Sequence, residues 1–122
     1  MDKIKLKDFE KLDLRIGTIK AVKDHPETND YLLLIDLGQV EQDMQIVADL
    51  KESYKKEKLI GKQIIYLDNI MPLTIGGIES QGLLLVTHKG GKPVLLSPEK
   101  KVLPGVRVAG IRDSESYHHE KV

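Results

Sequence analysis

The polar side chains of this sequence that best suit chemistry stand together at Glu79-Ser80-Gln81, just after Gly76-Gly77. A serine hydroxyl becomes a nucleophile when a histidine base lies within hydrogen-bond reach, and a glutamate acts as a general acid beside a second carboxylate. The sequence places no histidine next to Ser80 and no obvious paired carboxylate beside Glu79. The segment therefore supports hydrogen bonding to a ligand better than it supports catalysis.

The histidines occur in settings that favour structural roles. His25 lies in the turn sequence DHPETND, where capping of the backbone is the default explanation. His118, His119 and Glu120 would bind a metal only adventitiously, because we expect them in a mobile polar tail. The chain has no cysteine, which excludes disulfides, thiolate nucleophiles and zinc–thiolate sites. We predict no catalytic residue, no cofactor and no metal site.

Short apolar stretches bounded by turn residues predict a series of short strands that would position this segment. The first strand is expected at 14–22, and Gly17 is expected to mark a bend or bulge within it. Gly76-Gly77 permits a sharp corner before the strand that begins at Ser80, with Thr74-Ile75 forming a short edge pairing. The further strands are expected at 31–36, 44–50, 63–70, 82–88, 94–97 and 104–110.

Two helices are predicted from the spacing of apolar residues. Residues 5–13 have apolar positions near a spacing of three, which suits a short amphipathic helix with Phe9 as its anchor, within the chain or across a dimer seam. Residues 50–63 have a rough helical spacing that ends at Gly61, a natural C-cap. This second helix would lie between strands.

The order of these elements indicates an all-β fold. One interstrand helix is too little for βαβ units and suits a five-stranded Greek-key barrel of the oligonucleotide/oligosaccharide-binding (OB) class, with a short N-terminal helix and extra C-terminal strands. A β-sandwich is the alternative fold. We expect one domain over residues 1–122, with a core at about 8–110 and a polar tail at 113–122.

The formal net charge is zero, so a uniformly basic nucleic-acid surface is not expected. Charge is nevertheless arranged in blocks, because residues 24–50 contain seven acidic and no basic residues, whereas 51–62 contain five lysines. Such blocks can fold into one positive and one negative face or remain solvated loops. We expect a soluble, intracellular protein, because no apolar stretch is long enough to span a membrane and no signal-peptide core follows the first lysines.

Several ordered motifs resemble one family over about residues 8–108. The stretches DFEKLDLRIGTIKAVKDHPETNDYLLLIDLG, QIVADL and LIGKQIIYLDNIMPLTIGGIESQGLLLV are similar to the tRNA-binding domain that is appended to methionyl-tRNA synthetases and also occurs as small free-standing dimers. The resemblance implies an OB barrel that binds tRNA by shape and backbone with little sequence reading. It also implies a cytoplasmic homodimer that acts alone or in trans with a synthetase catalytic chain. The synthetase motifs HIGH and KMSKS are absent, so we expect an accessory protein and no enzyme activity.

The resemblance also implies RNA-binding positions. Where relatives carry basic residues in the corner segment, this chain has Met71, Thr74 and Gly76, which removes three potential phosphate contacts and is expected to weaken binding and its salt dependence. Lysines on the helix side, or Lys89 and Lys92, would have to compensate. Arg15 matches the family but equally suits a structural ion pair. The expected RNA-binding residues are Asn69, Ser80, Gln81, Leu83, Arg15, Lys62 and Lys55.

Two other functions remain open on the sequence alone. The uncharged segment IMPLTIGGI would suit an apolar groove in a chaperone-like, peptide-binding dimer of the same superfamily. A pure assembly domain that docks through its N-terminal helix is the third possibility.

Overall fold

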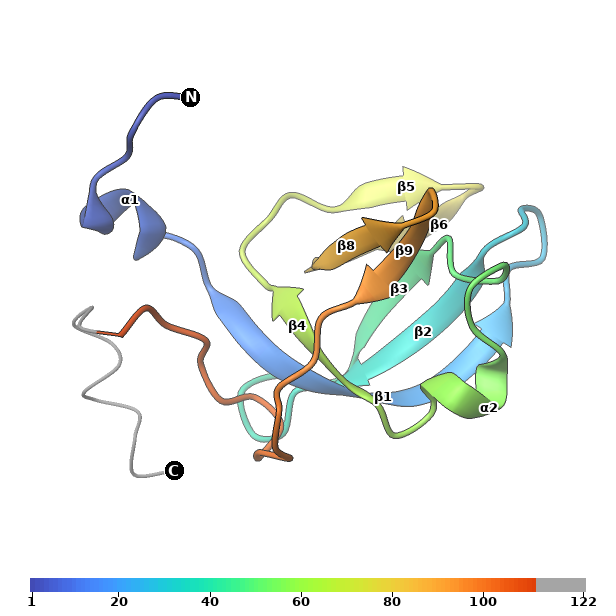
Figure 1. Ribbon diagram of the computed structural model, residues 1–122. Helices are drawn as coiled ribbons and strands as arrows, with labels where there is room; N and C mark the ends of the chain where they lie inside the picture. Colours follow the sequence, from blue (N-terminus) through green and yellow to red (C-terminus); the bar gives the residue numbers. More distant parts are fainter. Residues whose placement is uncertain (112–122) are drawn as a thin grey trace.

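The computed structural model describes residues 1–111, and its centre is a five-stranded antiparallel sheet that curls into a nearly closed barrel (Figure 1). The sheet has the strand order β3-β2-β1-β4-β7, and two separate hairpins, β5–β6 and β8–β9, complete the fold. The predicted all-β OB-type barrel is thereby confirmed. The predicted polar tail and the group His118-His119-Glu120 lie outside the described residues. The elements are α1 (Leu6–Phe9), β1 (Leu14–Asp24), β2 (Tyr31–Asp36), β3 (Met44–Ala48), α2 (Lys56–Leu59), β4 (Gln63–Leu67), β5 (Leu73–Ile75), β6 (Ile78–Ser80), β7 (Leu83–Leu84), β8 (Val86–Lys89) and β9 (Lys92–Leu95).

Strand β2 shows why this sequence forms a barrel with one packed interior. Its buried residues Tyr31, Leu33 and Ile35 alternate with half-buried neighbours, as the two-residue period of a strand requires. The same interior is filled from β1 and β4 by Ile19, Ile64 and other apolar side chains that are almost fully buried. The barrel is therefore filled with side chains and leaves binding to its outer surfaces and ends.

Gly17 has a different role from the predicted bulge. It pairs in register with Ile64, and the irregularity in β1 falls between Ile19 and Ala21 instead. A Cβ atom on Gly17 would lie 2.4 Å from Cγ2 of Ile35, a distance that real side chains do not adopt. The glycine is needed because β1 and β2 approach closely inside the barrel.

The helix predicted at 50–63 is much shorter in the structure. Only Lys56–Leu59 is helical, because the carbonyl of Leu50 accepts hydrogen bonds from the N–H groups of Ser53 and Tyr54 and closes a turn, after which Lys55 is extended. Gly61 has a φ of +89°, as its predicted C-cap position requires. The lysines of this segment therefore lie on a turn followed by one helical turn.

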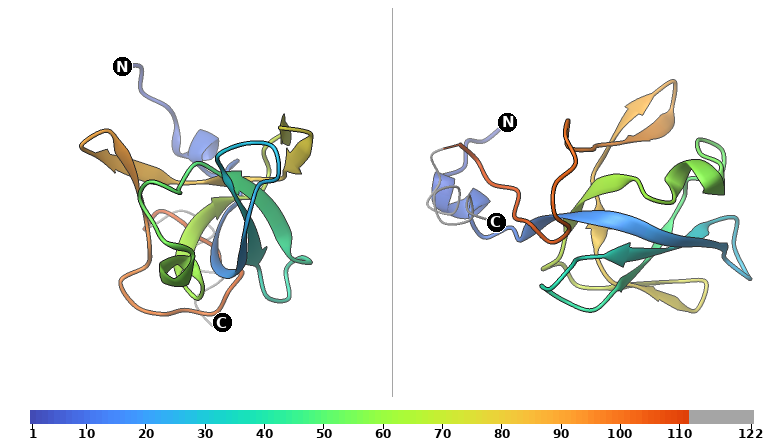
Figure 2. Two further views of the ribbon diagram at one scale, coloured as in Figure 1. Left: turned by 90° about the vertical axis from the view of Figure 1, so that its right-hand side faces the viewer. Right: turned by 90° about the horizontal axis from the view of Figure 1, so that it is seen from below.

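The strand predicted at 82–88 is interrupted at Leu85. Its N–H donates to the carbonyl of Ile65 in the barrel at 3.1 Å, and its carbonyl accepts the N–H of Leu96 at 3.4 Å. The chain thus leaves the barrel after β7 and forms a projecting hairpin, β8–β9. Figure 2 (left) shows this hairpin and hairpin β5–β6 diverging to opposite sides of the barrel.

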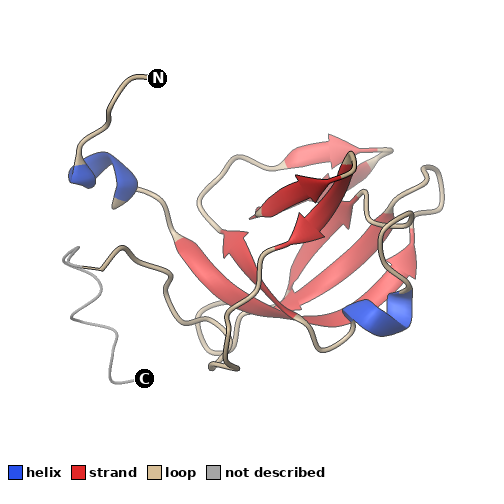
Figure 3. Ribbon diagram, in the orientation of Figure 1, coloured by secondary structure: helices blue, strands red, loops and turns tan. Residues whose placement is uncertain are grey.

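The last predicted strand, 104–110, is reduced to a single bridge between Arg107 and Arg15. Backbone bonds from Gly105 to Ile16 and from Val108 to Leu14 still hold this segment along β1. At the other terminus, α1 projects from the barrel, as Figure 3 shows, and none of its residues is buried. The short N-terminal helix was predicted correctly, but it packs little against its own barrel.

Candidate nucleic-acid interface

Ser80 and Gln81 close the barrel between β6 and β3. The hydroxyl oxygen of Ser80 accepts the N–H of Val47 at 3.0 Å, and the side-chain oxygen of Gln81 accepts the N–H of Gln45 at 2.8 Å. The N–H of Gln81 donates to the carbonyl of Gln45 at 2.9 Å, and the amide group of Gln45 donates to the carbonyl of Glu79 at 2.9 Å. Ser80 is only 5% exposed. These polar groups, which suggested ligand binding in the sequence, are engaged in holding two strands together.

Replacing Ser80 by alanine should therefore destabilise the protein. The substitution leaves the buried N–H of Val47 without its acceptor, which typically costs about 1 to 3 kcal/mol. Urea denaturation followed by circular dichroism measures this loss in the free energy of unfolding. Ser97→Ala, at an exposed serine, is the matched control and should change stability little. An unchanged stability for Ser80→Ala would show that this closing bond is unimportant.

Asn69 and Arg15 are also occupied by structural contacts. The side-chain oxygen of Asn69 accepts the N–H of Asp13 at 2.8 Å, and its amide donates to the carbonyl of Lys11 at 2.7 Å. Arg15 donates from Nε to the carboxylate of Asp13 at 2.7 Å and from Nη1 to the carbonyl of Gly105 at 3.1 Å. Both side chains fasten the N-terminal segment to the barrel.

The surroundings of Arg15 are acidic. A hydrogen bond with the carboxyl of Asp68, together with burial and the charges of Asp68 and Asp13, raises the pKa of Glu41 to about 7. A carboxyl group with a raised pKa reports that negative charges are crowded here, because a second anion disfavours ionisation. This end of the barrel is therefore a poor site for RNA phosphates.

The glycine corner is held in place by His25. The Nδ1 atom of His25 accepts the N–H groups of Glu27 and Thr28 at 2.9 and 3.1 Å, and Nε2 lies 2.8 Å from the carbonyl of Ile75. These contacts fix Nε2 as the protonated nitrogen of a neutral ring. Gly76 has a φ of +57° and a Cβ there would lie 2.6 Å from the imidazole. His25 thus has the structural capping role predicted for it and fixes the tip of hairpin β5–β6.

A groove of about 380 Å³ opens between the two hairpins, above β3. Hairpin β5–β6 contributes Leu73 and Ile75, and β7 contributes Leu83, whose side chain is 43% exposed. The lining is mainly aliphatic, but Asp49 and His88 also line the groove, and within residues 1–111 neither side chain has a hydrogen-bond or ion-pair partner. We call this feature the interhairpin groove. It is lined by 46–50, Leu73, Ile75, Ser80, 82–84, Val86, His88, Gly91, Pro93 and Leu95.

Within residues 1–111, several lysines without an ion-pair partner lie on another surface, formed by the α2 segment and hairpin β8–β9. The Nζ atom of Lys62 lies 5.9 Å from the ring centroid of Tyr54, whose hydroxyl oxygen accepts the N–H of Leu95 in β9 at 3.1 Å. Tyr54 therefore joins the α2 segment to hairpin β8–β9, and Figure 2 (left) shows both on the same side of the barrel. We call this surface the lysine face. Within the described part of the chain, none of its members has an ion-pair partner: Lys55, Lys58, Lys62, Lys89 and Lys92.

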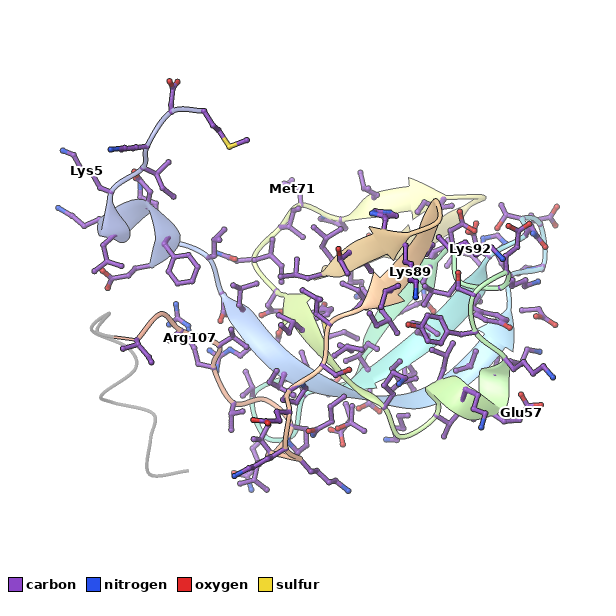
Figure 4. All side chains as sticks on the ribbon, in the orientation of Figure 1. Lys5, Glu57, Met71, Lys89, Lys92 and Arg107 are labelled. Atoms are coloured by element: carbon purple, nitrogen blue, oxygen red, sulfur yellow. The ribbon has the colours of Figure 1, made fainter. Side chains whose placement is uncertain are left out.

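Lys89 and Lys92 are placed by the hairpin register. His88 pairs with Pro93 and both line the interhairpin groove, so the next pair, Lys89 and Lys92, faces the other way. Like charges directly opposite each other destabilise a strand pair, and here they flank a Gly90-Gly91 turn. Figure 4 shows both near the hairpin tip, far from Met71 and the α1 end. Two such cations favour an anionic ligand on this surface.

Other lysines are already neutralised. Lys51 and Lys56 both contact Asp24, at 3.2 and 2.9 Å, and these hydrogen bonds lower the pKa of that carboxyl. Lys20 contacts Asp43 at 2.8 Å. The acidic residues of the block 24–50 are thus divided between the two ends of β2 and are not gathered on one face.

The structure brings together only part of the predicted site. Ser80, Gln81 and Leu83 adjoin the interhairpin groove or its seam, Lys55 and Lys62 lie on the lysine face, and Asn69 and Arg15 belong to the N-terminal contacts. Met71 and Thr74 are exposed uncharged side chains where relatives were expected to be basic. Sequence reasoning missed Asp49 and His88. For His88 the available signal was the alternation of β8, which becomes informative once the hairpin is known, and Asp49 lies outside that strand.

No helix within residues 1–111 is long and apolar enough to cross a bilayer. Comparison with family models finds a match to "Putative tRNA binding domain" over residues 14–107. Among curated proteins, the methionine–tRNA ligase of Pyrococcus horikoshii is 43% identical over 109 residues, which is 88% of this chain but 15% of the ligase. The chain thus spans about one sixth of the length of that relative.

Solved structures of similar length share the fold. The CsaA chaperone protein of Picrophilus torridus superposes with a TM-score of 0.81 at 35% identity, covering 88% of this chain and 100% of that chain. A MetRS-related protein of Pyrococcus horikoshii gives a TM-score of 0.79 at 28% identity, covering 88% and 99%.

Proposed function

This chain belongs to the tRNA-binding domain family, and we propose on that basis that it binds tRNA through the lysine face. The observation that carries the proposal is the set of lysines on the α2 segment and hairpin β8–β9 that have no carboxylate partner within residues 1–111, on a protein whose formal net charge is zero. Phosphates neutralised by lysines release condensed counterions, which supplies affinity independent of base sequence. An A-form helix hides its base edges in a deep groove, so its shape and backbone are what such a surface meets.

The seven predicted RNA-binding residues divide under this proposal. Lys55 and Lys62 contact phosphates on the lysine face, and Leu83 contacts RNA at the interhairpin groove. The remaining four support the fold that presents these surfaces: Asn69, Ser80, Gln81 and Arg15. This division explains how binding is retained although Met71, Thr74 and Gly76 carry no charge.

A titration with bulk tRNA tests the proposal. We expect saturable binding at low salt that weakens as salt rises, measured by filter binding or fluorescence anisotropy. A neutral protein of similar size is the reference. Binding no tighter than that of the reference protein would refute the proposal.

We further propose that the chain is an accessory module without aminoacylation activity, acting in the cytoplasm alone or in trans with a synthetase catalytic chain. The similar methionine–tRNA ligase supports a role beside such a chain, since the matching part is only 15% of that ligase. A bound module raises the local tRNA concentration at a catalytic partner. Addition of the protein should then lower the KM for tRNA of a separate synthetase catalytic chain.

A homodimer is the third part of the proposal. Apolar side chains are exposed at the α1 end, with Ile4 70%, Leu6 53% and Met71 84% exposed. The chain just after α1 is held by hydrogen bonds from Arg107 to the carbonyls of Glu10 and Leu12. A second copy that covers this end would bury these apolar side chains, and exposed apolar patches commonly mark such interfaces. This arrangement leaves the lysine face open on both copies.

Light scattering after size-exclusion chromatography tests the dimer. We expect twice the chain mass of 13.7 kDa for the native protein and the mass of one chain for the double variant Ile4→Glu, Leu6→Glu. Ile60→Glu, at a side chain that is 55% exposed beyond α2, is the control and should remain dimeric. A monomeric native protein would refute this part of the proposal.

Peptide binding is a second candidate function, and the aliphatic lining of the interhairpin groove is the observation in its favour. The similarity to a chaperone of Picrophilus torridus adds support. Suppression of the aggregation of an unfolded client, unaffected by added tRNA, would favour this candidate over tRNA binding.

A further inference from the structure

The lining of the interhairpin groove is mainly aliphatic but includes the carboxylate of Asp49. Asp49 directly follows β3, lines the groove and is exposed, and within residues 1–111 its carboxylate has no hydrogen-bond or ion-pair partner. The adjacent Lys51 does not neutralise it, because Lys51 contacts Asp24. Because Asp49 is exposed and unpaired, its carboxylate is available to accept hydrogen bonds from a ligand in the groove.

This carboxylate restricts which part of an RNA chain the groove accepts. Phosphates are repelled by Asp49, and the lysine pair Lys89 and Lys92 faces away from the groove on the other side of the hairpin. A nucleobase, in contrast, has apolar faces that suit Leu73 and Pro93 and an edge that carries hydrogen-bond donors. The volume of about 380 Å³ is within the usual range for small-ligand sites.

We propose that the interhairpin groove binds one unstacked base of the RNA and that Asp49 selects bases with an exposed amino group, namely cytosine, adenine or guanine, over uracil. A carboxylate accepts hydrogen bonds from the amino group of cytosine, whereas uracil presents a carbonyl oxygen at the same position. The phosphates on either side of this base then lie outside the groove, away from the carboxylate of Asp49. The inference rests on the proposed tRNA binding and adds base selection to recognition of the backbone.

The choice of a base over a peptide follows from the family and from the neighbouring charge. A groove of this size suits one inserted base, and the uncompensated lysines on the far side of hairpin β8–β9 and on the α2 segment suit the rest of the polyanion that carries the base. A peptide with a basic side chain would also satisfy Asp49, but it would leave the lysine face without an anionic partner. Binding of a peptide in the groove is therefore an alternative that the experiment below detects.

Paired oligonucleotides test the inference. Labelled eight-nucleotide oligocytidylate and oligouridylate differ at the position that meets Asp49, and their dissociation constants are measured by fluorescence anisotropy at low salt, beside that of bulk tRNA. We expect the native protein to bind oligocytidylate about five- to tenfold more tightly than oligouridylate. Asp49→Asn should abolish this preference, because an asparagine amide accepts from cytosine and donates to uracil equally well.

Glu52→Gln is the control for loss of one negative charge. Glu52 is exposed three residues beyond Asp49 and does not line the groove, so its variant should keep the preference for cytosine while changing affinity for both oligonucleotides alike. Equal affinities in the native protein, with tRNA still bound, would overturn the base selection and leave the proposed function standing. Displacement of bound oligocytidylate by a lysine-containing apolar peptide that binds more tightly would assign the groove to peptides. Absence of all RNA binding would overturn both proposals.

Discussion

Replacing Gly105 by alanine is expected to lower the free energy of unfolding by about 2 to 5 kcal/mol. Gly105 has a φ of +93°, a conformation that costs an L-residue roughly 1 to 2 kcal/mol. Its new Cβ would also lie 2.2 Å from the carbonyl oxygen of Leu37, and such overpacking typically costs about 1 to 3 kcal/mol. The backbone of Gly105 anchors the last segment to β1, since its N–H donates to Ile16 at 2.7 Å. Urea denaturation measures the loss.

Gly61→Ala is a close control for the backbone part of this cost. Gly61 has nearly the same φ, +89°, but no atom lies within 4 Å of the position that its new Cβ would take, so only the conformational penalty applies. The difference between the two variants isolates the collision with Leu37. Equal losses would show that the C-terminal segment shifts freely away from the loop after β2.

Neutralising the lysine face is expected to produce the largest change in function. The variant with Lys55, Lys62, Lys89 and Lys92 all changed to glutamine should bind tRNA at least about tenfold more weakly at low salt. The plot of log affinity against log salt should become shallower by roughly 3 to 4, because each lost phosphate contact removes about one counterion release. Anisotropy titrations at four salt concentrations give both quantities.

A second variant separates this surface from net charge. Changing Lys3, Lys5, Lys7 and Lys23 to glutamine removes the same total charge from exposed lysines elsewhere on the chain. We expect this variant to retain most of the affinity and the salt slope. A loss equal to that of the lysine-face variant would mean that tRNA responds only to overall charge.

The strands were predictable because their chemistry is local. The alternation in Tyr31–Asp36 and the two-glycine corner at Gly76-Gly77 depend on neighbouring residues, and both appear in the structure where the sequence placed them. The helix at 50–63 failed because a turn closed on Leu50 satisfies the same apolar spacing with fewer helical residues. The bulge failed because a glycine in a strand equally indicates close approach, which is its role at position 17.

The candidate site was less predictable, because it depends on contacts distant in sequence. Ser80 and Gln81 have the polarity of ligand-binding residues, but their partners Val47 and Gln45 lie more than thirty residues away along the chain. The position of Asp49 in the interhairpin groove could not be predicted, because the groove forms only when both hairpins are in place. A short polar motif predicts that its side chains form hydrogen bonds, but the fold determines which groups are their partners.

The hydrogen bonds that close the barrel between β3 and β6 also determine where it opens locally. Of the four hydrogen bonds that join β3 to the end of β6, three involve a side chain, whereas β1 and β2 are joined by a long backbone ladder with one irregularity. Side-chain bonds part at lower free energy than a cooperative ladder, so amide hydrogens of Gln45 and Val47 should exchange with solvent through a local opening while those of β2 exchange only on global unfolding. The interhairpin groove borders this line, which allows it to widen without melting the barrel.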